Sequence, residues 1–131
     1  MNAQPACPCG GPDYASCCGR YIDGGIPAPD AEQLMRSRYT AYTRNDEQYI
    51  GATWAARTRP ADLATAGDST QWLGLTLRNS STDGDSAIVE FVARYKINGR
   101  AHRLHEVSRF VREEGCWFYL DGSFPESTPA S

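Results

Sequence analysis

The sequence predicts an α+β fold in which helices pack on one face of a curved antiparallel sheet, behind a short cysteine-rich segment. Residues 31–45 show helical periodicity, whereas the residues after 70 alternate with a period of two. Clusters of turn-forming residues separate the alternating runs. The length of 131 residues is in the usual range for one domain, so we expect one main domain with an appendage.

The clearest helix is predicted for residues 31–45, where Asp30 is placed to act as the N-cap. Apolar side chains gather on one face of this helix and polar side chains on the other. A second, shorter helix is predicted for Glu47 to Arg57, and residues 60–67 are expected to form a loop or a short helix. The helices therefore precede the sheet along the chain.

The predicted sheet begins near Thr70, where leucines at positions 73, 75 and 77 alternate with other residues. Residues 79–85 form a predicted turn, and residues 87–97 a long strand with apolar side chains on one face. Asn98-Gly99 is a strong hairpin signal. The next strand runs to about Arg112, residues 113–115 turn the chain, and the last strand covers 116–121. Residues 125–131 are expected to be a disordered tail.

The composition excludes several classes of function. The chain has 40% hydrophobic and 22% charged residues, as globular proteins do, and its net charge of -3 argues against a dedicated nucleic-acid binder. No apolar run approaches the roughly 20 residues that span a bilayer, so we expect no membrane insertion. The N-terminus lacks the basic and apolar regions of a signal peptide, and we expect a cytoplasmic protein.

The stretch CPCGGPDYASCC places Cys7, Cys9, Cys17 and Cys18 close together. Persistent disulfides are uncommon in a reducing compartment, so these thiols are better interpreted as metal ligands. Four thiolates surround Zn²⁺ tetrahedrally if the chain folds back sharply, and Gly10, Gly11 and Pro12 suit such a turn. Such a closed site is structural rather than catalytic. A disulfide and a reactive thiol remain as less favoured alternatives.

The cysteine stretch resembles the SEC-C motif, a short zinc-binding segment of the form CxC followed by Cys-His or Cys-Cys. The segments LMRSRYTAY, TW, QWLGL, EVSRF and GCWFYLDG resemble the YchJ (UPF0225) family of uncharacterised bacterial proteins. The resemblance implies an NTF2-like cone of helices and bent sheet for residues 30–122, and zinc on the four cysteines. It implies no catalytic residues. The segment GGPDY stands where SEC-C motifs often carry basic residues, which weakens any inference of an acidic or nucleic-acid partner.

The chain is accordingly divided into a SEC-C-like zinc-binding segment (1–29), an NTF2-like domain (30–124) and the tail (125–131). In the domain, Arg38 points with the apolar face of its helix and needs an anionic or carbonyl partner when buried. Glu106 and Asp121 are the candidate partners. The pairing would be either a structural ion pair or part of a ligand pocket. That pocket would consist of Arg38, Trp54, Trp72, Glu106, Ser108 and Asp121, with the tryptophans as walls.

Glu106 would be the general acid or base if the pocket were catalytic, but the sequence does not decide whether the protein is an enzyme. His102 and His105 are three residues apart on a strand and so face opposite sides, which excludes a paired site. Cys116 is interpreted as a small apolar filler, and Trp117, Phe118 and Tyr119 as core residues.

Two functions follow from these features. The first is a zinc-binding adaptor whose knuckle contacts another protein, with a homodimer compatible with the domain. The second is a small-molecule binder or enzyme that uses the cavity of the cone. Nucleic acid and membrane are not expected as partners.

Overall fold

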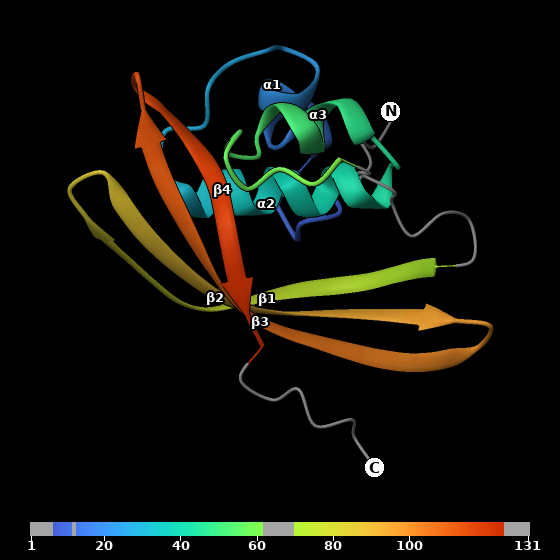
Figure 1. Ribbon diagram of the computed structural model, residues 1–131. Coiled ribbons are helices and arrows are strands. Elements are labelled where there is room, and N and C mark those ends of the chain that lie inside the picture. The colour runs from blue at the N-terminus through green and yellow to red at the C-terminus, as the bar shows by residue number, and fades with distance from the viewer. Residues whose placement is uncertain (1–6, 12, 62–69, 125–131) are drawn as a thin grey trace.

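The computed structural model describes residues 7–11, 13–61 and 70–124. The chain forms the 3-10 helix η1 (Tyr14–Ser16) and the helices α1 (Gly19–Ile22), α2 (Ala31–Thr43) and α3 (Glu47–Ala52). The strands are β1 (Thr70–Asp83), β2 (Ser86–Ile97), β3 (Arg100–Glu113) and β4 (Cys116–Ser123). They form one antiparallel sheet in the order β1-β2-β3-β4, which bends strongly around α2 (Figure 1). The predicted α+β architecture is therefore correct.

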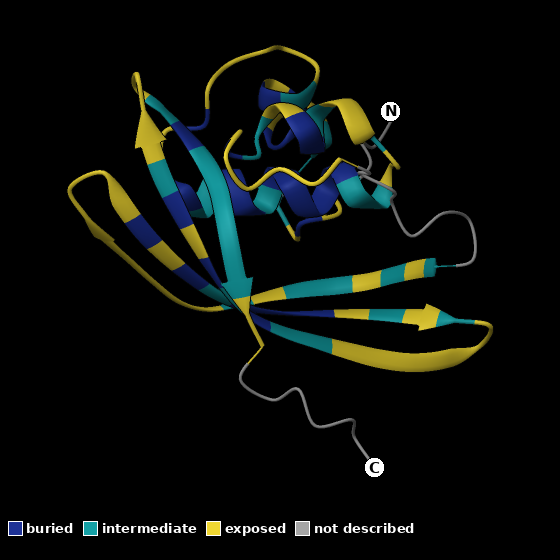
Figure 2. Cartoon of the chain, viewed as in Figure 1, coloured by how far each residue is buried: buried dark blue, intermediate teal, exposed yellow. Residues whose placement is uncertain are grey.

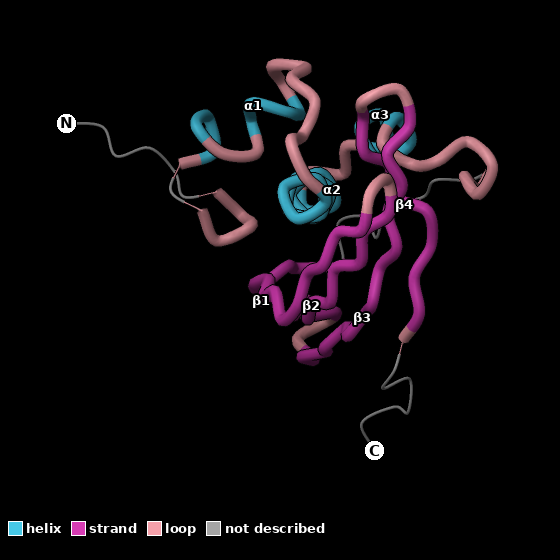
Figure 3. Tube along the Cα trace, turned by 90° about the vertical axis from the view of Figure 1, so that its left-hand side faces the viewer, coloured by secondary structure: helices cyan, strands magenta, loops and turns pink. Residues whose placement is uncertain are grey.

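Helix α2 begins where the sequence predicts, because the Asp30 side chain accepts a hydrogen bond of 2.8 Å from the Gln33 amide. Its apolar face, which includes Leu34 and Met35, is buried against the sheet. Figure 3 looks along this helix and shows it above the inner face of the strands. Helix α2 and the inner face of the sheet thus enclose the core.

Helix α3 is shorter than predicted, since it ends at Ala52 and not at Arg57. The Thr53 hydroxyl donates a 2.7 Å hydrogen bond to the Tyr49 carbonyl, and the chain then leaves the helix to pair with β4. The Ala55 amide bonds to the Tyr119 carbonyl, and the Tyr119 amide bonds to the Thr53 carbonyl, each at 2.8 Å. Pairing with a strand satisfies backbone groups that a longer helix would have bonded internally.

Strand β1 departs from simple alternation. Register shifts interrupt its pairing with β2 between Trp72 and Gly74 and again between Leu77 and Asn79. The first irregularity leaves Leu73 44% exposed, whereas Leu75 and Leu77 remain half-buried. The predicted turn at 79–85 is also too long, because β1 continues to Asp83 and pairs with Ser86. Only Gly84 and Asp85 turn the chain, and Gly84 has a positive φ of 61°.

The other hairpins agree with the sequence. Asn98 and Gly99 both have positive φ, as a two-residue turn between right-twisted strands requires, and so do Glu114 and Gly115. Along β2 the alternate residues 87, 89, 91 and 93 are buried, while the far ends of the strands are exposed (Figure 2). Of the loop or short helix expected at 60–67, residues 62–67 lie outside the described residues, as does the expected tail at 125–131. Within the described part of the chain, no helix is long and apolar enough to cross a membrane.

Candidate functional site

The first candidate site is the group of four cysteines near the N-terminus. The sulfur atoms of Cys7, Cys9, Cys17 and Cys18 all lie within 4.8 Å of one another, and each cysteine is at most 7% exposed. All are free thiols, so no disulfide joins them. A tetrahedral ion with metal–sulfur bonds of about 2.3 Å separates its sulfur ligands by roughly 3.8 Å. The cluster therefore fits a metal ion that prefers thiolate ligands.

Tight turns bring the two cysteine pairs together. The Gly10 amide bonds to the Cys7 carbonyl at 2.9 Å, and Gly10 has a φ of 98°, which favours glycine. A Cβ at Gly11 would lie 2.6 Å from the Cys17 sulfur, so a side chain there would displace a ligand. Asp13 then caps η1 through the Ser16 amide at 3.1 Å, and Cys17 and Cys18 follow directly before α1.

The cysteine segment packs directly on the main domain. The Cys7 sulfur lies 3.7 Å from the Thr40 hydroxyl of α2, and the Arg36 guanidinium donates to the Cys9 carbonyl at 3.1 Å. The four cysteines belong to the same buried cluster as Leu34 of α2 and Val89 of β2. A metal ion bound here would therefore fasten residues 7–22 to α2.

The thiols also influence one another electrostatically. A hydrogen bond from the Cys18 thiol lowers the pKa of Cys9 to about 4, although burial opposes this shift. Burial, followed by the hydrogen bond with Cys9, raises the pKa of Cys17 to about 11. The surrounding thiols thus stabilise negative charge on the Cys9 sulfur, which is the state that ligates a metal.

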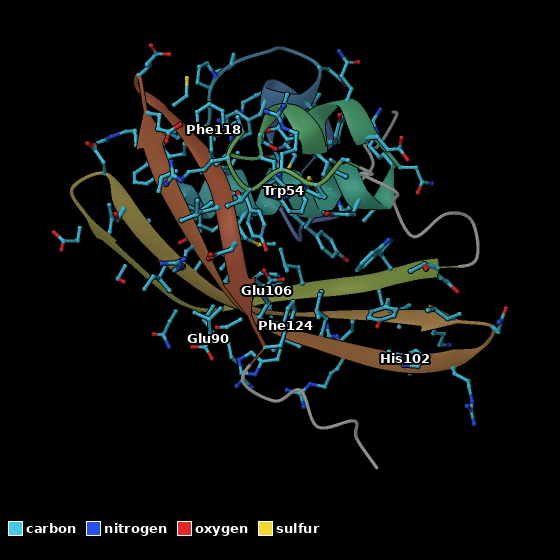
Figure 4. All side chains as sticks on the ribbon, viewed as in Figure 1. Trp54, Glu90, His102, Glu106, Phe118 and Phe124 are labelled. Atoms are coloured by element: carbon cyan, nitrogen blue, oxygen red, sulfur yellow. The ribbon has the colours of Figure 1, made fainter. Side chains whose placement is uncertain are left out.

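The second candidate site is a cavity of about 240 Å³ between α2 and the inner face of the sheet. Its walls are mostly aromatic and apolar, with a few polar groups among them. The lining residues are Met35, Arg38, Tyr39, Tyr42, Trp54, Trp72, Phe91, Ala93, Leu104, Glu106, Ser108, Phe110 and Tyr119. Figure 4 shows Trp54 and Glu106 on the side of the sheet that faces the helices. Of the predicted pocket residues, the structure places all except Asp121 around this cavity.

Arg38 is buried, as its helical position predicts. Of the two kinds of partner expected for it, the structure shows a carbonyl and not a carboxylate. Within the described residues, neither Glu106 nor Asp121 forms an ion pair with it. Its Nη1 instead donates to the Ile50 carbonyl at 2.9 Å and to the Thr53 hydroxyl at 2.7 Å. Its guanidinium also lies over the rings of Trp54 and Tyr119, 5.0 and 4.6 Å from their centroids. Burial lowers the pKa of Arg38.

Glu106 is 8% exposed and holds a second polar position in the cavity. Its Oε2 accepts hydrogen bonds of 2.8 Å from both the Ser108 hydroxyl and the Tyr119 hydroxyl. Burial and the neighbouring Glu106 raise the pKa of Tyr119, so this phenol remains a donor.

Asp121 is the predicted pocket residue that lies elsewhere. It is the direct cross-strand neighbour of Arg109, and Arg109 Nε donates to Asp121 Oδ1 at 2.6 Å. A register shift between Arg109 and Phe110 follows this pair. Since Phe110 is buried in the core, its neighbour Arg109 faces outward with Asp121. The Arg109 guanidinium lowers the pKa of Asp121.

The remaining predictions have mixed outcomes. His102 stacks on Tyr95, whereas His105 lies 2.7 Å from Glu90 on the opposite face, so the histidines form no paired site. Cys116 is half-buried. Trp117 is a core residue as expected, but Tyr119 also lines the cavity and bonds Glu106. The sequence contained a signal for this role, because a buried tyrosine hydroxyl normally requires a polar partner.

The fold and the cysteine geometry together define a class: an NTF2-like α+β domain that carries an N-terminal four-cysteine, SEC-C-type cluster. The family model described as "YchJ, middle NTF2-like domain" matches residues 30–122. The chain belongs to the YchJ-like, or UPF0225, family.

Named relatives and solved structures agree with this assignment. A UPF0225 protein of Methylibium petroleiphilum is 56% identical over 122 residues, which cover 92% of this chain and 90% of that protein. The solution structure of a SEC-C motif containing protein from Rhodopseudomonas palustris has a TM-score of 0.84 at 32% identity, covering 92% of this chain and 98% of that one. The crystal structure of another, from Psychrobacter arcticus, has a TM-score of 0.79 at 28% identity, covering 98% and 85%.

Proposed function

We propose that this protein binds a small molecule in the cavity beneath α2 and that a structural zinc ion on the four cysteines holds its N-terminal segment in place. The two parts rest on different observations and are tested separately. The adaptor function expected from the sequence is a second candidate.

The zinc proposal is supported by the ligand chemistry. Four cysteine sulfurs within 4.8 Å of one another suit a tetrahedral, thiolate-preferring ion, and their burial leaves no open position for water or substrate. Elemental analysis of the purified protein should give about one zinc per chain. Replacing both Cys17 and Cys18 by serine should remove it, whereas Cys116→Ser should not. Zinc retained by the double variant would contradict the assignment.

The observation that carries the ligand proposal is Arg38. This residue is 5% exposed, its guanidinium forms no ion pair within the described residues, and only Nη1 takes part in its hydrogen bonds to Ile50 and Thr53. A buried cation is costly unless its donors are satisfied, and this one borders a cavity of about 240 Å³. A bound molecule with a hydrogen-bond acceptor would complete the environment of Arg38.

Filling the cavity tests the ligand proposal. Ala93 of β2 is 1% exposed and lines the cavity, so Ala93→Leu adds apolar volume into the space that a ligand would take. Molecules found by ligand-observed NMR screening of the natural chain should no longer bind this variant. Ala101→Leu makes the same change at an exposed position of β3 and should leave binding unchanged. Equal binding by the Ala93 variant would overturn the proposal.

The adaptor candidate is favoured by one surface beside the cysteine segment. Ile26 is 54% exposed, next to a groove of about 450 Å³ that α1, α3 and β4 border. A protein partner that inserts an apolar side chain here should be captured by the natural chain and lost with Ile26→Ser. Leu73→Ser, at another exposed apolar site on β1, is the control. If the partner is a second copy of this chain, sedimentation should show a dimer. If Ile26→Ser leaves capture of the partner unaffected, this surface is not the contact site.

A further inference from the structure

The cavity presents both signs of charge to whatever occupies it. Arg38 from α2 supplies a cation, and Glu106 from β3 supplies a carboxylate. Among the described residues these two groups form no direct ion pair with each other. A ligand with a net charge would therefore be attracted by one of them and repelled by the other.

The hydrogen-bonding groups that Arg38 and Glu106 leave unpaired are of opposite kinds, donors on Arg38 and an acceptor on Glu106. Arg38 Nη1 is bonded to Ile50 and Thr53, and the Tyr42 phenol is a further hydrogen-bonding neighbour of the guanidinium. A guanidinium carries five N–H donors, so others remain without a partner among the described residues. On the other side, Glu106 Oε2 accepts from Ser108 and Tyr119, whereas Oε1 accepts from none of the described residues. The cavity thus offers donors from Arg38 and an acceptor from Glu106.

A second unpaired donor lies in the same wall. The Trp54 indole Nε1 is buried and has no hydrogen-bond partner among the described residues. A buried donor without a partner is unfavourable, so it indicates a partner that occupies the site during function. The donors of the cavity outnumber its free acceptors, and a carbonyl oxygen on the ligand would match this imbalance.

The volume of the cavity and its aromatic lining suit an aromatic ring. Trp54, Trp72 and Tyr119 are among its walls, so an aromatic guest would contact aromatic side chains. A dry cavity of about 150 Å³ is enough to hold benzene. The 240 Å³ found here therefore accommodates one aromatic ring with a polar substituent.

Building on the proposed small-molecule function, we infer that the ligand is an uncharged aromatic molecule whose ring carries a carbonyl acceptor beside an N–H donor, as in an aromatic amide. The carbonyl accepts from Arg38 and the N–H donates to Glu106 Oε1, while the ring lies among the aromatic walls. An anion would satisfy Arg38 but face Glu106, and a cation would do the reverse.

The test uses four probes of nearly one shape: benzamide, benzoate, benzamidine and toluene. The three tryptophans provide the signal, because each gives one indole N–H resonance. The resonances of Trp54 and Trp72, which line the cavity, should shift on binding, whereas that of Trp117, which lines the separate groove, should not. Benzamide should bind about tenfold or more tightly than each of the other three.

Glu106→Gln tests the role of charge with little change in shape. Without the carboxylate, Arg38 is uncompensated, so benzoate should gain about tenfold in affinity and overtake or match benzamide. Glu90→Gln makes the same change on the outer face, and Figure 4 shows Glu90 away from the helices. This control should keep the preference of the natural chain.

The outcomes separate this inference from the function on which it rests. If benzoate, benzamidine or toluene binds the natural chain best, with shifts confined to Trp54 and Trp72, the cavity binds small molecules but the amide class is wrong. If benzamide leads and Glu106→Gln leaves the order unchanged, Glu106 does not recognise the ligand and the inference also fails. If no probe shifts either resonance at millimolar concentration, the inference fails, and the screen with Ala93→Leu decides the proposed function separately.

Discussion

At the scale of single residues, Gly122 on β4 determines whether Glu106 can occupy its place. A Cβ built at Gly122 would overlap the Glu106 carboxylate, with its Cδ at 2.8 Å and its Cγ at 3.0 Å. That carboxylate cannot move freely, because Ser108 and Tyr119 both donate to it. The absence of a side chain at position 122 therefore leaves the space that the Glu106 carboxylate occupies.

Gly122→Ala should lower the free energy of unfolding by about 1–3 kcal/mol, through crowding and loss of these hydrogen bonds. Chemical denaturation measures the change. The double-mutant cycle with Glu106→Ala isolates the cause, since Gly122→Ala should cost much less once the carboxylate is gone. Equal costs in the two backgrounds would show that the alanine disturbs β4 itself.

The sequence predicts which side chains line the cavity better than it predicts the hydrogen-bond partners of those side chains. Helical periodicity places Arg38 inward, and strand periodicity places Glu106 and Ser108 on one face, because these patterns depend only on local geometry. The partner of Arg38 depends on where α3 ends, which brings the Ile50 carbonyl within 2.9 Å. Asp121 was misplaced because a register shift between neighbouring strands leaves no local signal.

At the scale of elements, α2 depends on its N-cap for a defined start. Asp30→Ala removes the 2.8 Å hydrogen bond to the Gln33 amide and should lower the free energy of unfolding by about 1 kcal/mol. Asp30→Asn keeps an acceptor oxygen and should lower the free energy of unfolding by only a few tenths of a kcal/mol. The midpoint of urea unfolding measures both. An equal loss in the two variants would mean that the charge of Asp30, and not its hydrogen bond, stabilises the helix.

The elements themselves were predictable where one local signal dominated. Asp30 and the helical period specified α2, and Asn98-Gly99 specified the β2–β3 turn. The errors occur where tertiary contacts compete with local preference. Helix α3 stops early because residues 53–55 pair with Tyr119, and β1 continues through a polar segment because β2 supplies a partner strand.

At the scale of the whole molecule, the cysteine segment and the domain share one core, since all four cysteines are buried with Leu34 and Val89. If zinc is the bound ion, a chelator should lower the melting temperature by more than about 5 °C, because binding free energy contributes to folding. Differential scanning calorimetry measures this, and added zinc should restore the original value.

Cys116→Ser is the matched control for metal removal, because Cys116 lies outside the four-cysteine cluster. It should respond to the chelator as the natural chain does. A melting temperature that the chelator leaves unchanged would mean that the domain does not depend on the metal.

At the scale of the whole molecule, buried tyrosines also limit the stability of the fold at alkaline pH. Burial is the largest cause that raises the pKa of Tyr39, Tyr42, Tyr49 and Tyr119 in the folded chain. Because these folded pKa values exceed the unfolded value of about 10, their contribution to stability is complete below pH 10 and is lost as pH rises further. Above that pH the unfolded chain binds fewer protons than the folded one, so the free energy of unfolding must fall.

Urea unfolding between about pH 8 and 11 should show this decline. Tyrosinate absorbance should then rise together with the loss of ordered structure. Full ionisation of these tyrosines near pH 10, with the far-ultraviolet circular dichroism unchanged, would contradict their burial.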